Sequence, residues 1–136
     1  MKLAICTDVF ADLSYTDMLD KVKSLGIDAV EMTAGGWGAR KHCNTAELLA
    51  DEGKRKEFMG ELKKRGMRIS ALNTSCNPLW PSKTGEEYKK SMYDCATLAG
   101  LLGVKKIVAM AGLPAGNETD TTPNWITSTV SWPDFM

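Results

Sequence analysis

Three segments of the chain repeat one design, in which a helical pattern ends at a glycine and a short apolar or β-branched run follows at once. They read SLGIDAVEM, KRGMRISAL and LLGVKKIVAM, and their glycines are Gly26, Gly66 and Gly103. A glycine at this place is typical of a helix that ends in a left-handed residue and leads into a strand. The spacing of the glycines is close to the length of one β/α unit. The sequence therefore predicts an array of β/α units.

Helical patterns fill the segments between these strand-like runs. Ser14 and Asp17 have the spacing of a capping box and precede an apolar stripe. Thr84 and Glu87 repeat that spacing in front of a longer stripe. We therefore expect one helix within residues 13–26 and another within residues 84–102.

The order of the elements predicts the architecture. A third helical pattern spans residues 44–65, where Gly53 indicates a short helix followed by a longer one. The strands are predicted over residues 3–7, 29–33, 69–72 and 106–110. Right-handed crossovers between such parallel strands give an α/β fold that forms the first half of a TIM barrel. The alternative is an open doubly wound sheet, although the first turn, TDVFADLS, lacks the glycine-rich phosphate loop of many such folds.

The length and the charge of the chain exclude several classes of function. With 136 residues, the chain is expected to form a single domain. Its 17 Lys and Arg are balanced by 17 Asp and Glu, so no basic face for binding nucleic acid or an anionic membrane is expected. No apolar run reaches the roughly 18 residues of a membrane span, and a cytoplasmic location is expected. The four cysteines lack metal-binding spacing and are predicted to be free thiols.

Candidate site residues follow the predicted strands, because functional groups in parallel α/β folds gather beyond the carboxyl ends of the strands. They are Glu31 at the end of the second strand, Trp37 and His42 in the loop that follows it, Asn73 and Asn77 after the third strand, and Trp125 after the fourth. Carboxylates and amides suit hydroxyl groups, and indole faces suit the C–H faces of sugars. A small-molecule sugar or sugar derivative is therefore the expected ligand.

The same residues also fit structural roles, which the sequence leaves open. Glu31 could pair with Arg40 or Lys2, because buried charges rarely lack a partner. Turn chemistry explains at least one of Asn73 and Asn77. The single histidine could be a surface residue, and the two candidate tryptophans could pack loops together.

Four strings in order carry a resemblance to a known family. They are MKLAICTDVF, GIDAVEMTAGGW followed by HCN, ISALNTSCNPLWP, and AMAGLPAG followed by PNWIT. With these strings the chain resembles the N-terminal half of the sugar phosphate isomerase/epimerase family of xylose isomerase-like TIM barrels. The resemblance covers essentially all 136 residues. It implies that residues 1–136 form one domain, the N-terminal half of a complete barrel.

The resemblance also implies a chemistry. Family members use a divalent metal, Mn, Mg or Zn, held by Glu, Asp, His and Glu of later strands, to move a proton next to a sugar carbonyl. None of those ligands maps onto this chain, so the chain alone is expected to be inactive, and no catalytic residue is assigned. The six site positions fall where family members face the substrate cavity. Family members often carry a histidine near Ser75 or at Trp80, and this sequence does not.

Two other functions stay open at this point. A metal-dependent lyase that acts on oxidised glycosides uses the same proton abstraction within the same superfamily. Alternatively, the chain is a non-catalytic half-barrel that binds carbohydrate or completes itself by forming a homo-oligomer through its exposed sheet edges. No phosphate-binding cluster is visible, so the sequence does not specify a phosphorylated substrate.

Overall fold

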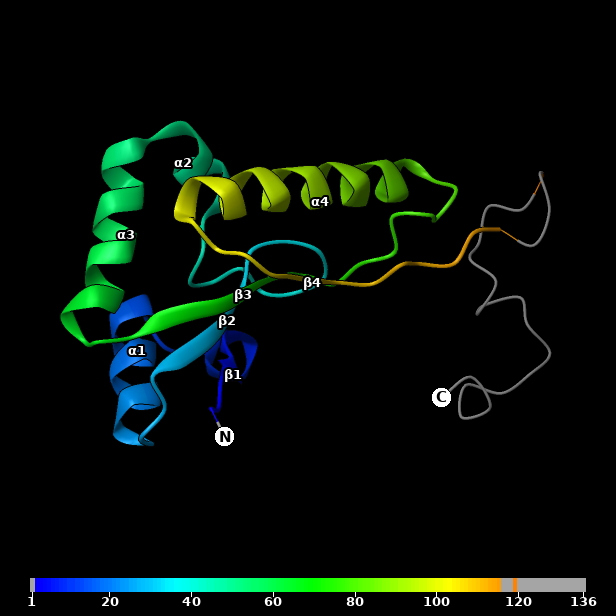
Figure 1. Ribbon diagram of the computed structural model, residues 1–136. Helices are drawn as coiled ribbons and strands as arrows, with labels where there is room; N and C mark the ends of the chain where they lie inside the picture. Colours follow the sequence, from blue (N-terminus) through cyan, green and yellow to red (C-terminus); the bar gives the residue numbers. More distant parts are fainter. Residues whose placement is uncertain (1, 116–118, 120–136) are drawn as a thin grey trace.

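The computed structural model describes residues 2–115 and residue 119, and within them four strands form one parallel sheet (Figure 1). In chain order the elements are β1 (Ile5–Cys6), the short 3-10 helix η1 (Thr7–Phe10), α1 (Tyr15–Ser24), β2 (Ala29–Thr33), α2 (Thr45–Ala50), α3 (Glu52–Lys64), β3 (Arg68–Thr74), α4 (Lys83–Leu102) and β4 (Ile107–Ala109). The strand order is β1-β2-β3-β4, so each strand lies beside its predecessor. This confirms the predicted α/β half-barrel. No helix in the described part of the chain combines the length and apolarity that crossing a bilayer requires.

One hydrophobic core lies between the sheet and the helices. Its fully buried members include Met18, Leu19 and Val22 of α1, Val30 and Met32 of β2, Leu62 of α3, Leu72 of β3 and Leu98 of α4. Burying a side chain of this size contributes about 1.5–3 kcal/mol. Because strand residues alternate between faces, the neighbours of these strand residues point to the other face, away from the helices.

The three glycines between a helix and a strand end their helices as predicted. Gly26, Gly66 and Gly103 have φ angles of 75°, 61° and 70°. Only glycine adopts this left-handed conformation without steric cost. Ser14 is the N-cap of α1, since its Oγ accepts a hydrogen bond from the Asp17 amide at 3.2 Å.

Two predicted helix boundaries were wrong. The break between α2 and α3 falls at Asp51 instead of Gly53, because Asp51 has an extended backbone and its side chain accepts the Lys54 amide at 3.0 Å. Helix α4 begins after Ser82, whose Oγ accepts the Gly85 amide at 3.2 Å, so the predicted capping box at Thr84 does not form the start. In both places the residue that caps the helix lies two residues upstream of the predicted position.

The strand lengths also differ from prediction. β1 is shorter than predicted, because the 3-10 helix η1 begins at Thr7. Thr7 Oγ1 accepts the Thr33 amide at 3.3 Å, in the place of the backbone carbonyl that a longer strand would supply. β3 is longer, because its pairing with β2 extends to Thr33 and Asn73. β4 spans only Ile107–Ala109.

The four cysteines are free thiols, as predicted, and three of them are buried. Burial raises the pKa of Cys43 and of Cys95 to about 11. Cys6 is the partly exposed one.

These buried thiols predict how stability depends on pH. The unfolded chain releases their protons near pH 9, whereas the folded chain keeps them to about pH 11, so the free energy of unfolding should fall as the pH rises through that window. Urea unfolding at several pH values measures this fall. The Cys43→Ala/Cys95→Ala variant should show a shallower fall than the parent chain, and an unchanged slope would contradict the assignment.

Candidate functional site

Two of the predicted site residues meet on the sheet face that carries no helices. Glu31 lies between the core residues Val30 and Met32, and Asn73 follows the core residue Leu72, so both side chains point away from the core. Asn73 Nδ2 donates a hydrogen bond to Glu31 Oε1 at 2.6 Å. The pair lies near the carboxyl ends of β2 and β3, where parallel folds place their functional groups.

The pair has a fixed orientation and a free acceptor. Asn73 Oδ1 accepts the Ser75 amide at 2.8 Å, so both ends of the Asn73 amide are engaged. No described residue donates to the second oxygen of Glu31, and none of the described cations, Arg40 and Lys2 included, forms an ion pair with it. The ion-pair alternative for Glu31 is therefore wrong, and its Oε2 can accept a hydrogen bond from a ligand hydroxyl.

The loops around the pair are tied together by hydrogen bonds. The Trp37 amide donates to the Ser75 carbonyl at 2.9 Å, and the Gly36 amide donates to Ser91 Oγ of α4 at 3.0 Å. Ser91 Oγ also lies 3.2 Å from Thr74 Oγ1 at the end of β3. The loop after β2 is thus fastened to both β3 and α4, and the rim beside the pair is preorganised.

Asn77 has a positioning role in this rim. Its side chain is fully buried, and its Oδ1 accepts the amides of Leu113 at 2.9 Å and Leu79 at 3.3 Å. Its Nδ2 donates to the Leu113 carbonyl at 3.1 Å. Asn77 therefore holds the segment after β4 against the loop after β3. Asn73 and Asn77 each accept the amide two residues ahead, which confirms the turn chemistry expected of at least one of them.

An aromatic cluster lies on the α4 side of the rim. Trp37 meets the ring of Tyr88 edge-on, with centroids 6.3 Å apart and planes at 85°. Trp80 lies on Tyr88 from another direction, with centroids 6.5 Å apart. The sequence does not predict this contact, since nothing local in it links positions 37, 80 and 88.

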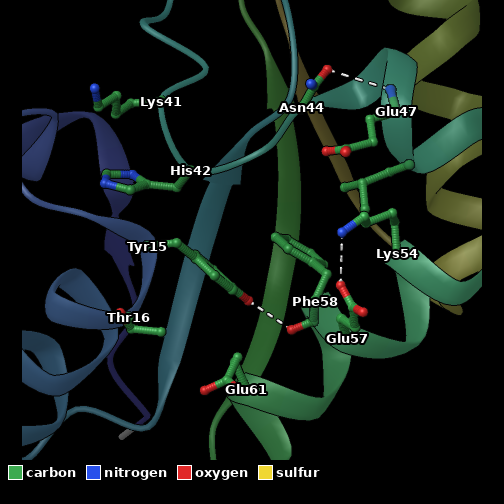
Figure 2. Close-up of a pocket in the computed structure, with 11 residues that line it drawn as sticks. Tyr15, Thr16, Lys41, His42, Asn44, Glu47, Lys54, Glu57, Phe58 and Glu61 are labelled. Atoms are coloured by element: carbon green, nitrogen blue, oxygen red, sulfur yellow. Dashed lines mark hydrogen bonds and ion pairs between the residues drawn. The ribbon is translucent and has the colours of Figure 1, made fainter.

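His42 belongs to a different place, a groove of about 500 Å³ in the helix layer (Figure 2). Tyr15 of α1 lines one side together with Lys41 and His42 of the loop between β2 and α2, and residues of α2 and α3 such as Glu47 and Glu57 line the other side. His42 is buried, and its Nε2 lies 3.1 Å from the Leu13 carbonyl. It is therefore not a surface residue, and the structure does not bring it together with Glu31 and Asn73.

The groove and the pair compete as candidate sites, and the chemistry favours the pair. In the groove, the Tyr15 hydroxyl donates to the Phe58 carbonyl at 2.9 Å. Burial raises the pKa of this hydroxyl above its ordinary value. Lys54 pairs with Glu57 at 3.1 Å. The Tyr15 hydroxyl and the Lys54–Glu57 pair are thus already engaged, whereas no described residue donates to the second carboxylate oxygen of Glu31.

Among the described residues, no group of three or more His, Cys, Asp and Glu side chains is placed to hold a metal ion. Trp125, the sixth predicted site residue, lies outside the described residues.

Comparison with known proteins shows a relative by sequence. No family model matches the chain. It is 51% identical over 136 residues to the uncharacterized protein YfiH of Bacillus subtilis strain 168, and the match covers 100% of this chain and 44% of that protein. The chain therefore spans less than half the length of this curated relative.

Comparison of structures shows the fold. The chain is similar to the crystal structure of the probable 3-DHS dehydratase AsbF, involved in petrobactin synthesis, from Bacillus anthracis. The TM-score is 0.58 at 22% identity, and the match covers 82% of this chain and 39% of that chain. AsbF is a TIM barrel protein, and the described strands and helices of the present chain form half of such a barrel.

Proposed function

We propose that this chain supplies a sugar-binding wall of an isomerase or epimerase that moves a proton next to a sugar carbonyl. The observation that carries the proposal is the Glu31–Asn73 pair on the helix-free face of the sheet. Its free carboxylate oxygen accepts a hydroxyl hydrogen bond, and the Asn73 amide holds that carboxylate in place. Hydrogen bonds of this kind to a charged acceptor are worth about 1.5–3 kcal/mol.

The divalent metal that the resemblance implies, Mn, Mg or Zn, does not fit the described residues as a bound group. The Glu31 carboxylate already shares one oxygen with an amide, and the described residues offer no group of three or more His, Cys, Asp and Glu side chains that could hold a metal ion. The proposed role of this chain is therefore to bind and orient the sugar, and no catalytic step is assigned to its residues.

A Glu31→Ala variant tests the proposal. Loss of the carboxylate should weaken the binding of neutral sugars by about tenfold or more, measured by titration calorimetry against a panel of monosaccharides and their methyl glycosides. Glu57→Ala, which removes a carboxylate from the groove, is the matched control and should leave the affinity unchanged within about twofold. Equal affinities for the parent chain and the Glu31→Ala variant would refute the proposal.

Elimination is a second candidate reaction on the same site. The structural neighbour AsbF is described as a probable dehydratase, which removes water from its substrate. Elimination beside a carbonyl and isomerisation both begin by removing a proton from the carbon next to that carbonyl. A lyase acting on oxidised glycosides therefore uses the same sugar-binding wall, and product analysis of the active protein distinguishes the two reactions.

Assembly through the sheet edges is a candidate role of a different class. In the described sheet, β1 and β4 each pair with one neighbouring strand, and Ile107 and Val108 of β4 are 41% and 39% exposed. A second copy that covers the β4 edge would bury these two side chains and pair the backbone groups of that edge. Native mass spectrometry should then show an even-numbered assembly that Val108→Lys disrupts. A monomer at micromolar concentration would contradict this role.

A further inference from the structure

Lys106 lies on the same face of the sheet as the Glu31–Asn73 pair. The Leu72 amide donates to the Lys106 carbonyl at 3.0 Å, so the chain already follows the β3–β4 ladder at Lys106, directly before β4 begins. Val108 of β4 is the register partner of Asn73. Register partners on neighbouring strands point to the same face, and so do side chains two residues apart along one strand. Val108 and Lys106 therefore share the helix-free face with Asn73.

Glu31 and Lys106 lie on either side of one small residue. Ala71 of β3 is the register partner of Glu31. The β3–β4 register pairs Leu72 with Ile107, so the residues that precede these two lie side by side. Because neighbouring strands are about 4.8 Å apart, the backbones at Glu31 and Lys106 are about 10 Å apart across Ala71. A ligand that lies over Ala71 would therefore meet a carboxylate at one end and an ammonium group at the other.

Both of these charged groups are available to a ligand. No described residue donates to the second carboxylate oxygen of Glu31. Lys106 is exposed, and its ammonium group forms no hydrogen bond or ion pair with any residue in the described part of the chain. An ammonium group donates up to three hydrogen bonds, and a carboxylate only accepts them. The two groups together suit a ligand that carries a hydroxyl group and, at its other end, an anionic group.

From this arrangement we infer that the substrate is a sugar acid whose carboxylate binds Lys106 while one of its hydroxyl groups binds Glu31. This inference rests on the proposed sugar site at Glu31. A hydrogen bond between an ammonium group and a carboxylate is charge-assisted and stronger than one between neutral groups. A neutral sugar would leave the ammonium group of Lys106 unused. Lys106 is thus a specificity-determining residue, which selects the acid over the neutral sugar.

The test compares sugars that differ in the group at C6. The pairs are glucuronate with glucose, galacturonate with galactose, and mannuronate with mannose, each titrated into the 136-residue chain at low ionic strength. For at least one pair, the acid should bind about three- to tenfold more tightly than the neutral sugar. Lys106→Met should remove that preference and leave the affinity for the neutral sugar unchanged within about twofold. Lys106→Arg keeps the charge and should keep the preference.

Lys105→Met is the matched control, because it removes the same charge from the adjacent residue, which strand alternation directs to the other face. Circular dichroism verifies that each variant is folded. Equal affinities within every pair, a preference that survives Lys106→Met, or a preference that Lys105→Met removes equally would overturn the inference while sugar binding at Glu31 could still stand.

Two further outcomes are decisive. Glucose 6-phosphate that binds more tightly than glucuronate, with a preference lost in Lys106→Met, would overturn the carboxylate as the anionic group. Failure of all six sugars to bind, or affinities insensitive to Glu31→Ala, would overturn the proposed function itself and the inference with it.

Discussion

Replacing Gly36 with alanine is expected to lower the free energy of unfolding by about 2–5 kcal/mol. Gly36 has a φ angle of 70°, which disfavours a residue with a side chain. A Cβ atom at this position would also lie 2.3 Å from the Ser75 carbonyl oxygen, which belongs to the backbone. Because that carbonyl also accepts the Trp37 amide, the substitution should disturb the rim as well as the overall stability.

Chemical unfolding measures this effect, and Gly60→Ala provides the control. Gly60 lies inside α3 with open space around its Cα, so alanine there should raise the free energy of unfolding by about 0.5–1 kcal/mol. A Gly36→Ala variant as stable as the parent chain would show that the loop after β2 is not held as described.

Replacing Asn77 with alanine is expected to lower the free energy of unfolding by about 2–3 kcal/mol. The substitution leaves the amides of Leu79 and Leu113 and the Leu113 carbonyl without their buried partner. Asn44→Ala, which removes the more exposed N-cap of α2, should cost only about 1 kcal/mol.

The same variant decides between two roles for Asn77. As a positioning residue it should affect stability strongly and change sugar affinity by less than about twofold while the chain is folded. The direct substrate contact that the sequence predicted would instead give a loss of affinity with little loss of stability. Titration calorimetry and urea unfolding on one preparation separate these outcomes.

Much of the fold could be predicted because its signals are local. Each of Gly26, Gly66 and Gly103 sits between a helical stripe and a strand, and a single residue type suits the left-handed turn there. The helix starts were harder, because several polar residues near each start can cap it. Asp51 and Ser82 cap their helices through contacts that the sequence alone does not rank above their neighbours.

The candidate site could be predicted only in part, because its pairing depends on tertiary structure. The carboxyl ends of β2 and β3 identified Glu31 and Asn73 separately, but their hydrogen bond joins positions 42 residues apart in the sequence. His42 lies in the loop after β2, the strand that contains Glu31. That loop turns into the helix layer, where the His42 side chain meets the Leu13 carbonyl. Position after a strand therefore does not fix which face a loop residue reaches.

Amide chemical shifts report whether sugar binds on the helix-free face of the sheet. The titration adds a sugar that binds the chain while two-dimensional NMR spectra of the 15N-labelled protein are recorded. We expect the amide signals of Glu31, Asn73 and Ser75 to move with a common dissociation constant, while those of Lys41, His42 and Glu57 in the groove stay in place. Shifts confined to the groove residues, with Glu31 and Asn73 unchanged, would contradict it.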